Sequence, residues 1–198
     1  MKAMYPAIKR FTDILLSGLG MILLSPLFLI IGIVIKLTSP GAVFFRQKRV
    51  GAGKKLFTMY KFRTMRSDAP SDIPTHLLKD PFAYITGIGK ILRRTSMDEL
   101  PQLWNIFTGD MSLIGPRPAL YNQYDLIALR DEYKANDIRP GLTGLAQISG
   151  RDELPISQKA ALDGEYREKM GFGMDCRILL LTLKLALTGQ GVSEGGPR

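Results

Sequence analysis

Apolar residues dominate the N-terminal part of the chain and set it apart from the rest. Residues 14–35 carry no charge and are bounded by Asp13 and Lys36. About twenty apolar residues span the hydrocarbon core of a bilayer, so this run is a candidate membrane helix. A signal peptide fits less well, because the run is long and no small-residue cleavage site leads into a polar mature start. We therefore expect a membrane anchor over residues 1–38 and a second domain over residues 39–198.

Two features favour an anchor that bends back over one that crosses. Basic residues lie on both sides of the run, which favours keeping both ends on the cytoplasmic side. Pro26 cannot donate to the carbonyl of Ile22, so the helix should break there, and the Ser25 hydroxyl is placed to bond the freed carbonyl. A helix-break-helix that enters and leaves the same leaflet accounts for both features, and a straight spanning helix with a proline kink remains the alternative. The flanking basic residues are Lys2, Lys9 and Arg10 before the run, and Lys36, Arg46, Lys48 and Arg49 after it.

Beyond the anchor, short elements alternate with turns that contain glycine or proline. Period-two alternation on both sides of a glycine-containing turn predicts a β-hairpin. Apolar residues at helical spacing predict further helices. The expected fold class is α+β and mostly helical, with amphipathic helices at the membrane interface. The helix over 119–132 either lies on the membrane surface or packs on the domain. The expected strands are 42–50 and 55–65, the expected loop is 66–84, and the expected helices are 85–94, 97–107, 119–132 and 175–187.

Composition narrows the classes of function. The 198 residues include 27 Lys and Arg against 18 Asp and Glu, a formal charge of +9. Such a balance suits nucleic acid, anionic lipid or anionic substrates. A single cysteine, Cys176, excludes an intrachain disulfide framework. The only histidine, His76, has no His or Cys nearby, which argues against zinc and against a Ser-His-Asp triad.

The densest group of chemically active residues begins at Ser96. Ser96 and Glu99 have the spacing of a capping box, which would make Asp98 and Glu99 ordinary first-turn acids of a helix. Pro101 fits that interpretation poorly, because a proline so early tends to distort the first turn.

Arginines flank the same acidic pair. Arg93 and Arg94 precede it, and Arg117 follows it between two prolines. Carboxylates can bind a divalent cation and attack phosphorus, and a fixed guanidinium can hold a phosphate. Residues 137–147 are rich in glycine and proline, so their backbone amides are candidates for a phosphate cradle. The pattern therefore indicates metal-assisted phosphoryl transfer, with helix capping as the alternative.

The chain resembles the small monotopic phosphoglycosyl transferases, which belong to the bacterial sugar transferase family (polyprenyl-phosphate glycosyl-1-phosphate transferases). The resemblance covers about residues 8–187, nearly the whole chain. Its motifs are long and occur in the same order as in the family. They are Ser25-Pro26, Lys61-Phe62-Arg63-Thr64-Met65, the stretch from Ser96 to Pro118, Arg139-Pro140-Gly141-Leu142-Thr143-Gly144, and Ser149-Gly150-Arg151.

The resemblance implies a re-entrant anchor followed by a catalytic domain. The implied reaction transfers a sugar-1-phosphate from a UDP-sugar to a polyprenyl (undecaprenyl) phosphate and releases UMP. In the family this is the first membrane step of bacterial surface glycan assembly. The implied location is the bacterial inner membrane, with the catalytic domain on the cytoplasmic face and in contact with anionic headgroups.

The resemblance also implies roles for individual residues. Asp98 is the expected nucleophile, which forms a covalent phosphosugar-aspartate intermediate, and it is also the expected ligand of Mg²⁺, for which Mn²⁺ is a substitute. Glu99 is the expected base. The expected substrate- and phosphate-binding residues are Lys61, Arg93, Arg117, Arg139, Arg151 and Asp175. Residues 152–156 depart from the best-studied small members, which leaves the sugar open.

Two other classes of function stay in view. A membrane-anchored binding protein could use the same positive charge to hold anionic lipid or RNA, and a hydrolase could use the same site with water as acceptor. Nucleic acid is disfavoured, because the aromatic and basic residues form no known RNA-binding module. The sequence does not name the sugar or the glycan pathway, and a homodimer stays open.

Overall fold

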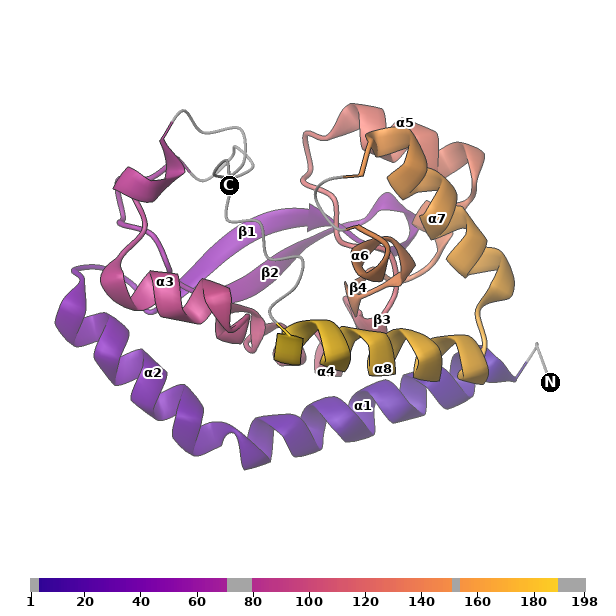
Figure 1. Ribbon diagram of the computed structural model, residues 1–198. Coiled ribbons are helices and arrows are strands. Elements are labelled where there is room, and N and C mark those ends of the chain that lie inside the picture. The colour runs from indigo at the N-terminus through magenta and orange to yellow at the C-terminus, as the bar shows by residue number, and fades with distance from the viewer. Residues whose placement is uncertain (1–3, 71–79, 151–153, 189–198) are drawn as a thin grey trace.

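The computed structural model describes residues 4–70, 80–150 and 154–188, and it is a mostly helical α+β structure with small sheets (Figure 1). Two long N-terminal helices run along one side, and the remaining elements lie against them. The helices are α1 (Tyr5–Leu23), α2 (Ser25–Thr38), α3 (Gly87–Arg94), α4 (Gln102–Thr108), α5 (Tyr124–Glu132), α6 (Leu145–Ile148), α7 (Ile156–Lys169) and α8 (Phe172–Thr188). The strands are β1 (Phe44–Val50), β2 (Leu56–Phe62), β3 (Ser112–Ile114) and β4 (Gly141–Thr143). Single 3-10 turns are η1 (Ala52–Lys54), η3 (Pro81–Ala83), η4 (Met97–Glu99) and η5 (Ala135–Asp137).

The apolar N-terminal run folds as two helices that meet at the expected break. Helix α1 ends at Leu23, α2 begins at Ser25, and the two helices are bent by 60°. The Ser25 hydroxyl donates to the carbonyl of Ile22 at 2.8 Å, which confirms the predicted bond. Both arms rise from the bend toward the rest of the structure (Figure 1). Among the described residues no single helix is long and apolar enough to span a bilayer, whereas the bent pair together meets those criteria of length and composition.

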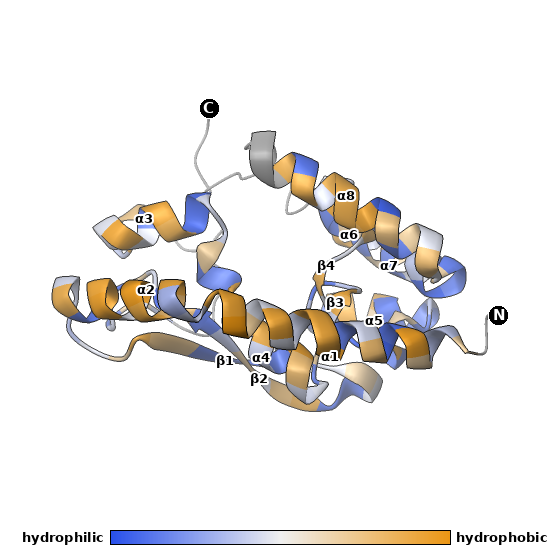
Figure 2. Ribbon diagram, turned by 90° about the horizontal axis from the view of Figure 1, so that it is seen from below, coloured by the Kyte–Doolittle hydropathy of each residue, from blue (hydrophilic) through white to orange (hydrophobic). Residues whose placement is uncertain are grey.

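Helix α1 turns several of its polar residues toward the domain. Asp13 and Ser17 are buried, and the Asp13 carboxylate accepts a hydrogen bond from the amide of Leu113 at 3.0 Å. The Arg10 guanidinium donates to the last carbonyls of α4 at 2.6 and 2.8 Å. Charge-assisted bonds of this kind are among the stronger ones in proteins. They hold α1 against α4 and β3, while much of its apolar surface stays exposed (Figure 2).

The strands form two separate sheets. Strands β1 and β2 make the predicted antiparallel hairpin, paired from Phe44 with Phe62 to Val50 with Leu56. Strands β3 and β4 make a short parallel pair that the sequence did not predict. Strand β4 lies in the segment expected to cradle phosphate.

Strand β4 approaches its neighbour backbone to backbone. A Cβ added to Gly141 would lie 2.1 Å from the backbone nitrogen of Gly115, so only glycine fits. The amide of Gly141 donates to the carbonyl of Pro116 at 2.8 Å. The phosphate-cradle expectation is therefore wrong for this amide, which is used within the fold.

Apolar clusters join the anchor helices to the domain. One cluster packs α2 on β2 and α3, and another packs α4 under the hairpin. Their buried members are Ile31, Ile35, Phe62 and Leu92 in the first, and Met59, Leu103, Ile106 and Met111 in the second. The position of α2 is therefore coupled to that of β2, which carries Lys61.

Some boundaries differ from those expected. The helix predicted over 97–107 begins only at Gln102 and is preceded by the separate turn η4. The helix predicted over 119–132 begins at Tyr124, and it packs on α7 through buried Leu126 and Ala160, so the packing alternative is confirmed for it. Helix α7 was not predicted, because its apolar positions are sparse and a glycine, Gly164, interrupts it.

Candidate active site

The acidic pair lies in η4, the single turn between α3 and α4. The chain enters this turn through Ser96, whose φ of 55° is in the left-handed region that side chains other than glycine seldom adopt. The Ser96 side chain makes no capping hydrogen bond, and the Glu99 side chain bonds Lys61 and Arg117 rather than the backbone. The capping-box interpretation is therefore wrong.

Glu99 is held by two cations. Lys61 Nζ lies 2.6 Å from Glu99 Oε1, and Arg117 Nη2 lies 3.2 Å from the same oxygen. Burial alone would raise the pKa of Glu99, but the charges and hydrogen bonds of Lys61 and Arg117 outweigh it and hold the pKa far below its usual range. Glu99 is thus ionised, and it brings a lysine and an arginine together beside Asp98.

Asp98 is in the opposite situation. The residue is 8% exposed, and its carboxylate accepts no hydrogen bond within the described part of the chain. Its closest cation is Lys61, at 4.0 Å. Burial raises the pKa of Asp98, and Lys61 and Arg93 offset only part of that effect, while the charge of Glu99 adds to it. A buried carboxylate without hydrogen bonds is costly for a fold, and such groups are frequent at reactive sites.

A contact with the chain that follows β2 fixes Arg93. Arg93 Nε donates to the hydroxyl of Thr64 at 2.9 Å, which ties the end of α3 to the chain two residues after β2. Helix α3 can approach this closely because position 89 is glycine: a Cβ on Gly89 would lie 2.0 Å from the carbonyl oxygen of Thr64. Arg93 is thereby held near Asp98.

Asn105 is a further site-supporting residue, one that the sequence interpretation missed. It is fully buried in α4, where its Oδ1 accepts from the amide of Tyr60 at 3.1 Å and its Nδ2 donates to the carbonyl of Thr58 at 2.8 Å. The Asn105 side chain thus hydrogen-bonds the backbone of β2 as a neighbouring strand would. It thereby fixes Lys61, which follows Tyr60, relative to η4. The sequence feature that could have identified Asn105 is its position as a polar residue on the apolar face of a short helix.

Arg117 reaches the site from the turn after β3. It is exposed, whereas Pro116 and Pro118 on either side are buried. A hollow of about 10 Å³ lies between Arg117, Glu99 and the hairpin, which is close to the smallest volume that holds a water molecule. Its other lining residues are Arg49, Met59, Lys61, Gln102 and Pro118.

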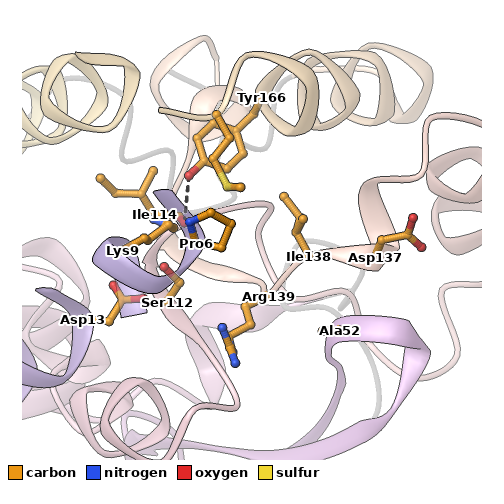
Figure 3. Close-up of a pocket in the computed structure, with 11 residues that line it drawn as sticks. Pro6, Lys9, Asp13, Ala52, Ser112, Ile114, Asp137, Ile138, Arg139 and Tyr166 are labelled. Carbon is orange, nitrogen blue, oxygen red and sulfur yellow. Dashed lines mark hydrogen bonds between the residues drawn. The ribbon is translucent and has the colours of Figure 1, made fainter. Parts of the chain in front are cut away.

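The structure does not bring Arg139 to the acidic pair. Its Nε donates to the carbonyl of Gly109 at 2.9 Å, at the C-terminal end of α4, whereas η4 precedes the N-terminal end. Seven helical residues separate the two ends by about 10 Å. Figure 3 shows Arg139 in a different cavity, of about 300 Å³, which Lys9 and Asp13 of α1 also line.

Asp175 also lies elsewhere, at the contact between α8 and α1. Its carboxylate accepts hydrogen bonds from Tyr5 at 2.6 Å, from Lys9 at 2.6 Å and from Tyr166 at 2.7 Å. These bonds indicate a role in docking the anchor. Arg151, the remaining predicted residue, lies outside the described residues.

The acidic pair suits a cation that shares its ligands with substrate. Among the described residues no group of three or more His, Cys, Asp or Glu side chains is arranged to hold a metal ion. Mg²⁺ is often bound through one or two carboxylates together with substrate phosphates and water. Asp98, with its oxygens free of hydrogen bonds from the described residues, fits that mode.

Carboxylates surrounded by lysine and arginine suit an enzyme that acts on phosphate groups, and comparison with known proteins places the chain more narrowly. The chain belongs to the bacterial sugar transferase family, whose profile matches residues 4–189. The family expected from the sequence motifs is thus confirmed.

Three relatives illustrate the range of the family. The exopolysaccharide production protein ExoY of Sinorhizobium fredii is 34% identical over 92% of this chain and 87% of its own length. A UDP-glucose:undecaprenyl-phosphate glucose-1-phosphate transferase of Caulobacter vibrioides is 41% identical over 91% of this chain and 70% of its own length. A UDP-N-acetylgalactosamine-undecaprenyl-phosphate N-acetylgalactosaminephosphotransferase of Aeromonas hydrophila is 37% identical over 94% of this chain and 45% of its own length. The latter two names specify different sugars on the same acceptor.

Proposed function

We propose that this protein transfers a sugar-1-phosphate from a UDP-sugar to polyprenyl phosphate and releases UMP, with Asp98 as a covalent nucleophile. The observation that carries the proposal is the buried Asp98 carboxylate, which lacks hydrogen bonds from the described residues and lies beside Lys61, Arg93 and the Glu99–Arg117 ion pair. The names of the relatives support the same reaction class.

In the first step an Asp98 oxygen attacks the β-phosphorus of the donor. The new bond joins that oxygen to phosphorus, and the bond from the β-phosphorus to the bridging oxygen breaks. UMP leaves with the bridging oxygen and its electron pair. Lys61, Arg93 and Arg117 hold the phosphate oxygens while charge develops on them, and guanidinium groups do so with paired bonds.

In the second step a phosphate oxygen of the polyprenyl acceptor attacks the same phosphorus, and the bond to Asp98 breaks to restore the carboxylate. Covalent catalysis replaces one difficult displacement with two easier ones. The role of Glu99 as the base for the acceptor stays a prediction. Its lowered pKa makes it a weak base, so the geometry gives more support to a role in aligning Lys61 and Arg117.

Mg²⁺, or Mn²⁺ in its place, would be held by Asp98 together with substrate phosphates and would offset negative charge at the reacting phosphate. Arg139, Arg151 and Asp175 stay predicted substrate-binding residues on the basis of the family resemblance alone, since the described contacts of Arg139 and Asp175 lie away from η4.

We further propose that lipid covers the outward face of α1 and α2, with the bend at Ser25 and Pro26 re-entrant and both ends on the cytoplasmic side of the bacterial inner membrane. The burial pattern supports this, because Asp13 and Ser17 are buried while apolar neighbours are exposed. A soluble helix shows the reverse pattern. Apolar side chains on α3, α4 and α8 are exposed as well, namely Ile91, Trp104, Phe107, Leu180 and Leu183.

One assay separates this function from its rivals. Purified protein is given each member of a panel of UDP-sugars, with and without undecaprenyl phosphate, and UMP is measured. UMP release that continues beyond one equivalent of the protein only when the lipid acceptor is present supports the transferase and identifies the sugar. Release at the same rate with water alone would show a hydrolase, and no release with any donor would favour a binding protein.

A further inference from the structure

The turn that carries Arg117 is fixed at both ends. The carbonyl of Pro116 accepts the amide of Gly141 at 2.8 Å, and the carbonyl of Pro118 accepts Nη1 of Arg49 at 3.0 Å. Both prolines are buried and have a fixed φ, so little backbone freedom remains between the two bonds. The exposed Arg117 side chain therefore extends from a backbone segment that is held on both sides by hydrogen bonds.

Strand β1 supplies one of these two hydrogen bonds, the one to the carbonyl of Pro118. Its last two residues, which pair with β2 in the hairpin, also contact the chain after Pro118, through a bridge between Arg49 and Leu120 and a hydrogen bond from the amide of Val50 to the carbonyl of Ala119 at 3.0 Å. The Arg49 side chain extends this pairing by one more contact, to Pro118. The contacts of β1 with residues 118–120 thus end at the residue next to Arg117.

Arg49 is an unusual residue for such a structural task. Its Nη2 donates to Gln47, and its Nε is buried without a partner in the described part of the chain. Burial lowers the pKa of Arg49 to about 9, and the nearby charge of Arg117 adds to that effect while Glu99 opposes it. An apolar or neutral side chain would avoid both the desolvation and the repulsion.

The position of Arg49 relative to Arg117 and Glu99 offers a reason for an arginine here, despite its desolvation and its repulsion with Arg117. All three residues line the same small hollow. A guanidinium there can bond the Pro118 carbonyl and Gln47 at once, which one ammonium group cannot do with the same planar fork.

We propose that Arg49 is a positioning residue for Arg117: by holding the Pro118 carbonyl, it directs the Arg117 guanidinium toward Glu99 and the donor diphosphate. The inference rests on the proposed function, because it assigns Arg117 to the diphosphate of a UDP-sugar. Arg49 acts through Arg117, so removing Arg49 should weaken diphosphate binding only while Arg117 is present.

The test is a double-mutant cycle on the full chain, with UDP as the binding probe. The variants are Arg49→Met, Arg117→Met and the double change, and UDP dissociation constants are measured by calorimetry alongside melting temperatures. Arg46→Met on the exposed part of β1 is the matched control. We expect Arg49→Met to weaken UDP binding by about 10-fold in the native background and by less than about 2-fold in the Arg117→Met background, because contacting or coupled residues are not additive.

An equal loss in both backgrounds would overturn the proposal, because Arg49 would then act on the ligand or on the whole fold. If Arg49→Met does not fold, Arg49→Lys takes its place in the cycle. Lysine that restores both melting temperature and UDP affinity would also overturn the proposal, since charge alone would suffice. The proposed function fails separately, by absence of acceptor-dependent UMP release in the unaltered protein, and the UDP cycle does not depend on that release.

Discussion

Neutralising each member of the acidic pair should change stability in opposite directions. Asp98→Asn removes a buried charge that accepts no hydrogen bond from the described residues, so we expect the melting temperature to stay constant or rise. Glu99→Gln breaks ion pairs at 2.6 and 3.2 Å and leaves Lys61 and Arg117 without their shared counter-charge. Because Arg117 is half exposed and water screens its pair, we expect a loss of about 1–3 kcal/mol for Glu99→Gln.

The two substitutions should also differ in their dependence on pH. The pKa of Asp98 is raised in the fold, so its contribution to stability is present below about 3.8 and is lost as pH rises through the folded pKa. The pKa of Glu99 is lowered, so its contribution is present above about 4.5 and is lost as pH falls below that value. The advantage of Asp98→Asn over the native protein should therefore grow as the pH rises above about 3.8, whereas the disadvantage of Glu99→Gln should be largest above about pH 4.5.

Activity gives the second readout for Asp98. Loss of a catalytic nucleophile lowers turnover by factors of up to about 10⁶. We expect Asp98→Asn to lose at least about 10³-fold in acceptor-dependent UMP release while keeping or gaining stability. Protein incubated with UDP-sugar labelled in its β-phosphate, without acceptor, should retain the label after denaturation, and the variant should not.

Two results would refute this reasoning. Normal turnover by Asp98→Asn would exclude the nucleophile, even if the melting temperature behaved as expected. A loss of stability above about 2 kcal/mol on Asp98→Asn would show that the carboxylate is a structural group, because neutralising a buried charge that has no hydrogen bond from the described residues, and whose closest cation lies 4.0 Å away, does not destabilise a fold to that extent.

Three further predictions address the metal, the bend and the support of the site. Excess chelator should stop transfer and Mg²⁺ or Mn²⁺ should restore it, and full activity in chelator would show that the cations of the protein suffice. Joint Ser25→Ala and Pro26→Leu changes should straighten the anchor into a helix of spanning length, move some N-terminal tags across the membrane and reduce activity. A tag that is already on the far side in the unaltered protein would contradict the re-entrant bend. Asn105→Ala should lower the free energy of unfolding by about 2–4 kcal/mol, because two backbone groups of β2 lose their buried partner, and an unchanged denaturation midpoint would show that water replaces it.

Local patterns were sufficient to predict the elements whose signal lies within a few residues. The break at Ser25 and Pro26 follows from one missing amide and one hydroxyl, and the hairpin follows from alternation around a short turn. The structure does bring together five of the residues that the motif resemblance implied for the site, although their roles stay predictions: Lys61, Arg93, Asp98, Glu99 and Arg117. No local rule brings residue 61 to residue 99.

What escaped prediction depends on contacts between distant backbones. The pairing of β3 with β4 requires Gly141 to touch Gly115, and neither segment alternates long enough to signal a strand. Asn105 and Arg49 are polar residues whose partners are main-chain groups of other elements, and a sequence pattern does not show those partners. For the same reason the family resemblance implies substrate binding for Asp175, whereas the hydrogen bonds of Asp175 lie at the contact between α8 and α1.

The polar face of α1 has a consequence for how the protein is made. Asp13 is bonded to the amide of Leu113, and Arg10 to the carbonyl of Ile106, so the partners of the first helix are synthesised about one hundred residues later. At ~5–20 residues per second, the nascent anchor waits ~5–20 s before those partners emerge from the ribosome. During that interval an apolar helix carrying an unpaired arginine and aspartate favours the headgroup region over both water and the bilayer centre. If lipid covers the outward face, the catalytic domain then closes onto an anchor already resting in the interface, and the buried polar bonds keep the anchor from later sliding into a spanning position.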